Sequence, residues 1–267
     1  MSDVIVLDID GGAMLDECLA SIRAQTVKPR RVLVFDNGSK SPVADRVQHA
    51  EVIRSETNLG FARGANEAYR HSTAAYVALI NNDVVLDPDW LATAEAALER
   101  DEKLAAVQTI IRRPDGRIDG AGIEISDGTY RQIGHGLAIG SPLAVAWGVS
   151  ATATLYRRAA LGDHIFDERF FAYYEDVELS ARLHKNDWRL SVLPVVKATH
   201  RGSSSAPVLR GNALRLRTRN RYWVARLHPS VGRMGALVME DVKLLVKGRS
   251  SLRGMVQGLF GVMSDER

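Results

Sequence analysis

The sequence predicts an α/β fold with a mainly parallel central sheet, flanking helices and a helical C-terminal extension. Three observations support this prediction. Short apolar, β-branched runs alternate with segments of helical spacing over the first 100 residues. Three of these runs end in Asp, Asn or Gly, which favour turns. After residue 206 the pattern changes to basic segments with helical spacing. Strands that alternate with helices in this way are typical of βαβ units and a parallel sheet.

The elements follow one another closely in the first 100 residues. Leu15, Leu19 and Ile22 show the helical spacing that we expect on a surface helix. We expect strands at 4–9, 31–35, 52–54 and 76–80, and helices at 14–25, 61–71 and 89–100.

The alternation becomes irregular after about residue 113. Residues 112–142 are rich in Gly, Asp and Ile and contain a strong turn signal at Pro114–Gly116. Further on, we expect strands at 145–156 and 190–196, and helices at 170–186, 210–227, 234–247 and 251–262. The simplest organisation is one catalytic domain over residues 1–205 and a basic helical extension over residues 206–267.

The composition is that of a soluble globular chain, with 46% hydrophobic and 25% charged residues in 267. A single cysteine, Cys18, excludes an internal disulfide and any multi-cysteine metal site, so a reducing, cytoplasmic location is expected. The N-terminus has no secretory signal pattern, and no apolar run reaches about 18 residues.

Acidic and amide residues follow three of the expected strands, at Asp10, Asp36–Asn37 and Asn82–Asp83. Open α/β sheets bind ligands beyond the carboxyl ends of their strands, so these residues could share a binding edge. Alternatively, each set could simply form a turn. The chain contains neither a Walker-type Gly-Lys-Ser/Thr loop nor a Gly-x-Gly-x-x-Gly motif after the first strand, which argues against a dinucleotide site.

Three segments could carry chemistry. Asp83, just beyond the buried run 76–80, has the placement that a hard divalent cation such as Mg²⁺ or Mn²⁺ requires. The Glu175–Asp176 pair is flanked by aromatic residues, and burial there would raise a pKa toward that of a general base. It could also be the acidic first turn of a helix. His200 follows the strand expected at 190–196, where it could reach Asp83 or serve only in packing.

The order of the motifs resembles the family-2 glycosyltransferases of the GT-A fold, in particular their bacterial rhamnosyltransferase-like branch. The resemblance covers about residues 3–225. It rests on five segments in order: Val34–Ser39, Asn58–Asn66, Ile80–Val84, Phe166–Glu178 and Thr199–His200. It implies an inverting enzyme that moves rhamnose or another hexose from a dTDP- or UDP-sugar to a hydroxyl of a glycan or a lipid-linked acceptor.

The resemblance also implies roles for matching residues. Asp176 would be the base that deprotonates the acceptor, with Glu175 beside it, and Trp147 would contact the acceptor. Asp83 and His200 would hold Mg²⁺ or Mn²⁺. The donor would be bound by Asp36, which would hydrogen-bond its base, and by Asn37, Asn58, Gly60, Arg63 and Asn82.

Two segments depart from the family pattern. Asp8–Asp10 stands where relatives have an Asn-Tyr-Asn type sequence, so the aromatic that would flank the donor's base is missing. Asn81–Asp83 has one aspartate where relatives have two, which predicts weak metal binding without nucleotide. A nucleotide-sugar-binding module with impaired catalysis is therefore the alternative.

Basic residues concentrate near the C-terminus. From Arg201 to Arg253 twelve Lys and Arg stand against Glu240 and Asp241, so the rest of the chain carries a net charge of −7. This segment could be a solvated helix face or could attach the enzyme to the inner, anionic face of the cell membrane. Its apolar positions could equally bury against the catalytic domain or a second subunit in a homodimer. Nucleic acid is the least supported partner, because no aromatic stacking motif on a sheet accompanies the arginines.

Overall fold

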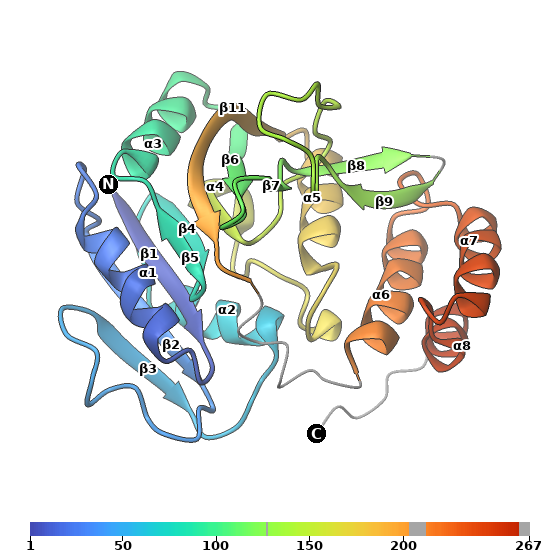
Figure 1. Ribbon diagram of the computed structural model, residues 1–267, viewed down its shortest axis with the longest axis horizontal. Helices are drawn as coiled ribbons and strands as arrows, with labels where there is room; N and C mark the ends of the chain where they lie inside the picture. Colours follow the sequence, from blue (N-terminus) through green and yellow to red (C-terminus); the bar gives the residue numbers. More distant parts are fainter. Residues whose placement is uncertain (127, 203–211, 262–267) are drawn as a thin grey trace.

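The computed structural model describes residues 1–126, 128–202 and 212–261. Its centre is a sheet in the order β3-β2-β1-β4-β10-β6-β11-β5, with β7 paired to β6, and β8 and β9 form a separate hairpin (Figure 1). The strands are β1 (Ser2–Asp8), β2 (Arg31–Asn37), β3 (Glu51–Ser55), β4 (Tyr76–Asn81), β5 (Val84–Leu86), β6 (Leu104–Arg112), β7 (Ile118–Gly120), β8 (Ile123–Ser126), β9 (Thr129–Gln132), β10 (Ala153–Arg157) and β11 (Arg189–His200).

Most of the described helices flank this sheet, while α6, α7 and α8 lie together beyond α5, on the right of Figure 1. The described helices are α1 (Ala13–Arg23), α2 (Phe61–Arg70), α3 (Trp90–Arg100), α4 (Arg158–Leu161), the 3₁₀ helix η1 (Glu168–Phe170), α5 (Glu175–Lys185), α6 (Ala213–Leu227), α7 (Met234–Val246) and α8 (Leu252–Phe260). None of these helices is long and apolar enough to cross a membrane.

The expected parallel order is present in the first four strands, where β1 pairs in parallel with both β2 and β4. The sheet as a whole is mixed, however, because β10 runs antiparallel between β4 and β6. Of the expected strand 145–156 only residues 153–156 form a strand, and β10 extends one residue further, to Arg157. The buried strand β6 was not expected from the sequence, because Ala105 and Ala106 lower its apparent strand propensity.

Two hydrophobic cores fix the two faces of the sheet. On one face, Leu15 and Ile22 of α1 and Trp90 of α3 are buried against it. On the other face, Ala65 of α2 and Leu179 of α5 are buried in the second core. The helices thus hold the strand ends in place, and the carboxyl ends of β1, β2 and β4 reach the same edge of the sheet.

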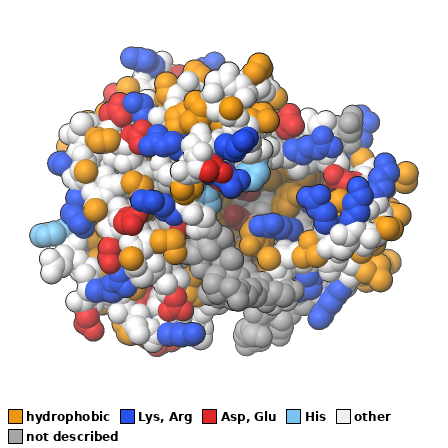
Figure 2. Space-filling model, viewed as in Figure 1, with side chains coloured by type: hydrophobic (Ala, Val, Ile, Leu, Met, Phe, Trp, Pro, Cys, Tyr) orange, Lys and Arg blue, Asp and Glu red, His pale blue; other side chains and the backbone are white. Residues whose placement is uncertain are grey.

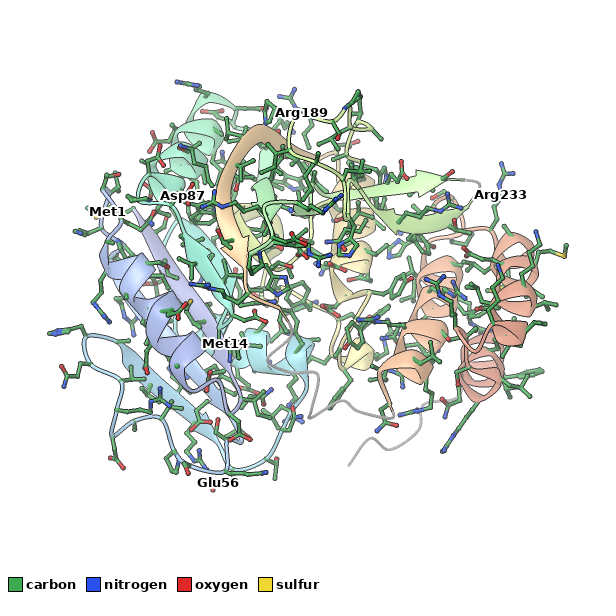
Figure 3. The ribbon with its side chains drawn as sticks, in the orientation of Figure 1. Met1, Met14, Glu56, Asp87, Arg189 and Arg233 are labelled. Carbon is green, nitrogen blue, oxygen red and sulfur yellow. The ribbon has the colours of Figure 1, made fainter. Side chains whose placement is uncertain are left out.

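The C-terminal helices form a third core with the β8–β9 hairpin and α5. Phe170 packs edge-on against Trp223 of α6, with ring centroids 5.9 Å apart. Gly128, in the hairpin, accepts a hydrogen bond from the backbone N–H of Arg233 just before α7, and Figure 3 labels Arg233 at this junction. The expected boundary at 205/206 and the expected helical residues 210, 211 and 262 lie outside the described residues.

Candidate active site

A cavity of about 520 Å³ opens where the strand ends face α5 and α6. The hollow is visible near the middle of the molecule in Figure 2, with Lys and Arg side chains along its right-hand side. Its lining combines two walls. The strand wall contributes Leu7, Asp8, Ile9, Asn37, Asn58, Gly60, Phe61, Asn81, Asn82 and Asp83. The helix wall contributes Ile123, Tyr130, Arg131, Gln132, Phe171, Ala172, Tyr173, Tyr174, Val177 and Arg217. Glu175, Asp176, Asp119, His200 and Ser150–Thr152 complete it.

The end of β1 holds a buried carboxylate in contact with the end of β4. The side-chain amide of Asn82 donates to Asp8 at 2.6 Å. Burial raises the pKa of Asp8, although the Asn82 hydrogen bond partly opposes this. Gly11 must lack a side chain, because a Cβ there would lie 2.1 Å from Asp8 Oδ1 and 2.4 Å from Asn82 Nδ2. The departure at residues 8–10 thus puts a carboxyl group and the apolar Ile9 into the cavity wall.

Asn37 and Asn58 hold the loop before α2. Asn37 donates to Asn58 Oδ1 at 3.2 Å and accepts from the backbone of Leu59 at 2.8 Å. Only glycine fits at position 60, because a Cβ there would lie 2.6 Å from Phe171 of the opposite wall. These three predicted donor residues therefore lie together and line the cavity.

Two other predicted donor residues lie elsewhere. Asp36 is fully buried, and its carboxylate accepts hydrogen bonds from Ser39 and Val43 and pairs with Arg54. Within the described structure Asp36 is not among the residues that line the cavity, and its contacts stabilise the loop that follows β2. Arg63 is half exposed outside the cavity and lies 3.8–3.9 Å from the carboxylates of Glu67 and Glu168.

Asp83 and His200 meet at the cavity as expected, and a third residue joins them. His200 Nε2 lies 3.2 Å from Asp83 Oδ2, while its Nδ1 donates to Asp119 Oδ2 at 2.8 Å. Burial disfavours the charged imidazole, but the hydrogen bonds to Asp119 and Asp83 outweigh this and raise the pKa of His200 to about 10. Within the described residues no group of three or more His, Cys, Asp or Glu side chains is arranged to hold a metal ion.

The donor chemistry of the pair still fits a divalent cation. A carboxylate oxygen and an imidazole nitrogen lie next to each other at the cavity, and Mn²⁺ accepts both ligand types. Asp119 accepts a hydrogen bond from the other ring nitrogen of His200, and a carboxylate in that position fixes the orientation of a metal-binding histidine. Two protein ligands leave most of the coordination sphere to be filled by a substrate.

The chain between η1 and α5 is held in a strained form. Phe171, Tyr173 and Tyr174 all have positive φ angles, between 42° and 71°, which non-glycine residues rarely adopt. The side-chain amide of Asn220, which is fully buried in α6, donates to the carbonyls of Phe170, Ala172 and Tyr173 at 2.7–3.0 Å. The expected helix start at Phe170 is therefore moved to Glu175.

Glu175 and Asp176 project into the cavity from the first turn of α5. Burial, and then the charge of Asp176, raise the pKa of Glu175 well above its ordinary value. Burial raises the pKa of Asp176 to about 6, although the Val177 and Ala151 backbone N–H groups oppose the shift. Glu175 Oε2 has no hydrogen-bond partner among the described residues. Burial thus disfavours two negative charges on this pair, and of the two carboxyl groups Asp176 has backbone N–H groups that favour its ionised form.

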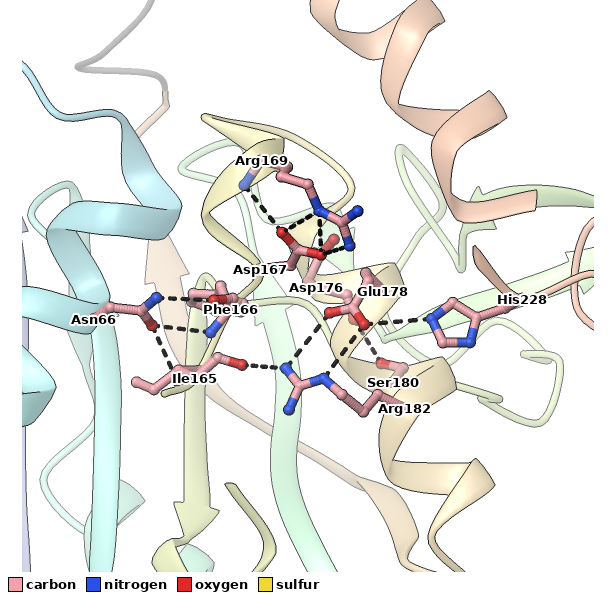
Figure 4. Close-up of polar contacts among 10 residues, drawn as sticks. All are labelled: Asn66, Ile165, Phe166, Asp167, Arg169, Asp176, Glu178, Ser180, Arg182 and His228. Carbon is pink, nitrogen blue, oxygen red and sulfur yellow. Dashed lines mark hydrogen bonds and ion pairs between the residues drawn. The ribbon is translucent and has the colours of Figure 1, made fainter. Parts of the chain in front are cut away.

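A polar network behind the pair fixes the chain that leads into α5 (Figure 4). Asn66, the last residue of the Asn58–Asn66 motif, accepts from the backbone N–H groups of Ile165 and Phe166 at 3.0 Å and donates to the Phe166 carbonyl at 2.8 Å. Arg182 of α5 donates to the Ile165 carbonyl at 2.6 Å. The Asn66 side chain thus has a structural role in joining α2 to the chain that leads to Asp176.

The same network connects α5 to the C-terminal helices (Figure 4). Glu178 pairs with Arg182 at 3.3 Å, and its Oε1 lies 3.3 Å from His228 Nε2 at the end of α6. All three side chains are largely buried. The basic extension is therefore packed against the helix that carries Glu175 and Asp176.

The helix wall of the cavity is aromatic and cationic. Tyr130 packs edge-on against Tyr174 at 5.8 Å, and the guanidinium of Arg217 lies 4.4 Å from the ring centroid of Tyr173. Trp147, the predicted acceptor contact, is outside the cavity lining in the described structure. Its ring stacks at a tilt on His184, 5.2 Å away, and its carbonyl bonds the same imidazole.

The family model "Glycosyl transferase family 2" matches residues 4–165. The chain belongs to this family. It is 27% identical over 235 residues to the N-acetylglucosaminyl-diphospho-decaprenol L-rhamnosyltransferase of Mycobacterium tuberculosis, and the match covers 76% of each chain. The protein is therefore a glycosyltransferase, and the predicted resemblance to the rhamnosyltransferase-like branch is confirmed.

Solved structures confirm the GT-A fold of this family 2 member. Residues 1–349 of S. aureus TarS, in complex with UDP-GlcNAc, match with a TM-score of 0.61 and 19% identity over 85% of this chain. GalNAc-T7 with UDP, GalNAc and Mn²⁺ matches with a TM-score of 0.61 and 14% identity, again over 85% of this chain. The chain spans 64% of the TarS fragment and 47% of the GalNAc-T7 chain.

Three residues at the site were not expected from the sequence. Asp119 lies in the irregular region 112–142, where no motif marks it, and only its contact with His200 shows its place. Arg131 lies in the same irregular region, and Arg217 is one of several arginines in a helix. A β-strand pattern at 123–132 would have been the only available signal.

Proposed function

We propose that this family 2 glycosyltransferase is an inverting enzyme that moves a hexose from a dTDP- or UDP-sugar to a hydroxyl of a lipid-linked glycan. The observation that supports this most is the buried Glu175–Asp176 pair, which shares one cavity with Asp83 and His200. A base and a site for a leaving diphosphate are the two elements that a single in-line displacement needs.

Asp176 is proposed as the base. Its raised pKa of about 6 leaves it ionised at neutral pH and still basic enough to accept a proton from a hydroxyl polarised in the transition state. Glu175 lies beside it, and burial, which raises its pKa, favours a carboxyl group that can donate a hydrogen bond to the bound sugars. Their position on the first turn of α5 also favours a negative charge on Asp176.

The donor is proposed to lie on the strand wall. Ile9, Asn37, Asn58 and Gly60 would contact its nucleoside, and Asn82 would lie near the diphosphate. Asp83 and His200 would hold Mg²⁺ or Mn²⁺, which when bound neutralises the departing diphosphate. The His200 ring lies between two carboxylates, with Nε2 facing Asp83 and Nδ1 facing Asp119. Nε2 must therefore be unprotonated to act as a ligand, while Asp119 keeps the ring in place.

The C-terminal helices are proposed to dock on an anionic membrane, where a lipid-linked acceptor resides. Part of their apolar stripe is used in the core, because Leu237 is buried and Val238, Leu245 and Leu259 pack against it. The remainder is exposed, at Met239, Val242, Val246, Leu252, Val256 and Phe260. Hydrophobic and basic side chains lie side by side over this region on the right of Figure 2, which matches an anionic surface. Sedimentation of the protein with anionic vesicles would support membrane docking. A dimer that forms without vesicles would instead assign this surface to a homodimer interface.

Titration with UDP and dTDP, with and without Mn²⁺, tests the proposed function. We expect at least one nucleotide to bind, with an affinity that Mn²⁺ raises and that the Asp83→Asn substitution returns to its metal-free value. Absence of binding for both nucleotides would overturn the proposal. Slow hydrolysis of the sugar donor on addition of metal would separate an active enzyme from a module that only binds nucleotide sugars.

A further inference from the structure

The arginines of α6 have different uses. The helix contains five arginines, and four of them contact residues of α6 itself or of α7 and α8. These four contacts are Arg215 with Gln257, Arg219 with Trp223, Arg221 with Glu240 and Asp241, and Arg226 with the Leu259 carbonyl. Arg217 is the exception, because it is exposed and lines the cavity.

Arg217 is held at the cavity by an aromatic ring. Its guanidinium lies 4.4 Å from the centroid of Tyr173, and within the described residues it forms no ion pair. A cation–π contact orients a guanidinium without neutralising its charge. Tyr173 itself is fixed by the strained segment before α5 and stands three residues before the proposed base.

A second cation reaches the same wall from another element. Arg131 lies on β9, is exposed, lines the cavity and forms no ion pair within the described part of the chain. The neighbouring Tyr130 packs on Tyr174, which anchors the hairpin to the segment before α5, and Glu124 of β8 lies opposite Arg131 without forming an ion pair among the described residues. Two guanidinium groups thus line one cavity from elements far apart in sequence.

The other charges of the cavity are arranged differently. Its carboxyl groups belong to Asp8, Asp83, Asp119, Glu175 and Asp176, which come from the strand ends, from β7 and from α5. In Figure 1, α5 lies between the strands on the left and α6 on the right. The cavity therefore contains two places for phosphate groups: the Asp83–His200 pair through a cation, and the two arginines directly.

We propose that Arg131 and Arg217 bind the diphosphate of a lipid-linked acceptor. This inference rests on the proposed function, which places the donor's own diphosphate at Asp83 and His200. Guanidinium groups form charge-assisted, often bidentate hydrogen bonds with phosphate. An acceptor diphosphate on the helix wall holds the attached sugar beside Asp176, and its lipid chain leaves toward the exposed apolar side chains of α7 and α8.

Binding of a short alkyl diphosphate to the protein saturated with UDP and Mn²⁺ tests the proposal. Arg131→Gln and Arg217→Gln should each weaken binding about tenfold, because each removes one charge-assisted contact. Arg100→Gln on α3, an exposed arginine far along the chain from the cavity, is the matched control and should leave binding unchanged. An alkyl glycoside of equal chain length should bind all four proteins alike.

Three results would overturn the proposal: no binding of the alkyl diphosphate by the unaltered protein, equal binding by all variants, or an equal loss of UDP affinity in both cavity variants. The last result would assign the arginines to the donor's diphosphate. Failure of UDP to bind even the unaltered protein would contradict the proposed function instead, and the alkyl diphosphate titration without UDP would still report on the arginines.

Discussion

The two walls of the cavity are built in opposite ways. The strand wall consists of the ends of adjacent strands and the loop that Asn37 braces, so its positions follow from a local βαβ pattern. The helix wall combines β9, a strained segment and α6, which are brought together by contacts such as those of Asn220. The wall proposed to bind the donor therefore depends on a βαβ pattern that the sequence displays, whereas the wall proposed to bind the acceptor depends on long-range packing.

The largest expected effect concerns the residue between the walls. Asp176→Asn should lower kcat about a thousandfold, because removing a general base costs between a hundredfold and ten-thousandfold. Binding of the nucleotide should change little, since the strand wall is untouched. Steady-state kinetics and nucleotide titration measure the two quantities. The control is Asp187→Asn, at an exposed position just after α5. If the Asp176 variant were as active as the unaltered enzyme, Asp176 would not be the base.

The proposed metal site next to the strand wall can be tested at Asp119, which orients His200. Asp119→Asn should raise the Mn²⁺ concentration for half-maximal activity about ten- to a hundredfold, because loss of such a partner weakens metal binding by that factor. The kcat at saturating Mn²⁺ should remain close to that of the unaltered enzyme. Asp115→Asn, in the turn before β7, is the control. An unchanged Mn²⁺ requirement would show that Asp119 does not position His200.

The helix wall can be tested at its brace. Asn220→Ala removes the two N–H donors that three carbonyls of the strained segment share, and the oxygen that accepts a hydrogen bond from Arg219. It should lower the free energy of unfolding by about 3 kcal/mol, at roughly 1 kcal/mol for each donor or acceptor lost. The kcat should fall about tenfold, because the segment that presents Glu175 and Asp176 relaxes. Denaturant unfolding and kinetics measure these changes, with the exposed Asn212→Ala as the control. A fall in stability without a fall in kcat would separate the brace from catalysis.

The smallest expected effect is the pH dependence of the activity, which the ionisation of Asp176 determines. Asp176 must be ionised to accept a proton, and burial raises its pKa to about 6. The value of kcat/KM should therefore be nearly constant above pH 7 and fall as the pH decreases through 6, to about a tenth at pH 5. A profile that stays flat down to pH 5 would contradict a base with a raised pKa.

The sequence predicted most of the strand wall and little of the helix wall. The alternation of strands and helices gave β1 to β4 and their ends, because those contacts depend on local spacing. It did not predict that Asp36 turns into its own loop, since the direction of that side chain depends on Arg54 of the next strand. Nor could it separate Arg217 from the other arginines of α6, because each acquires its role only when distant segments pack around it.

A crystal structure of the protein with UDP and Mn²⁺ tests the division of the cavity most directly. We predict the base beside Ile9 and Asn37, the diphosphate and the ion at Asp83 and His200, and Arg131 and Arg217 without contact to the nucleotide. A diphosphate bound instead to the two arginines, with Asp83 and His200 still joined to each other, would contradict the account.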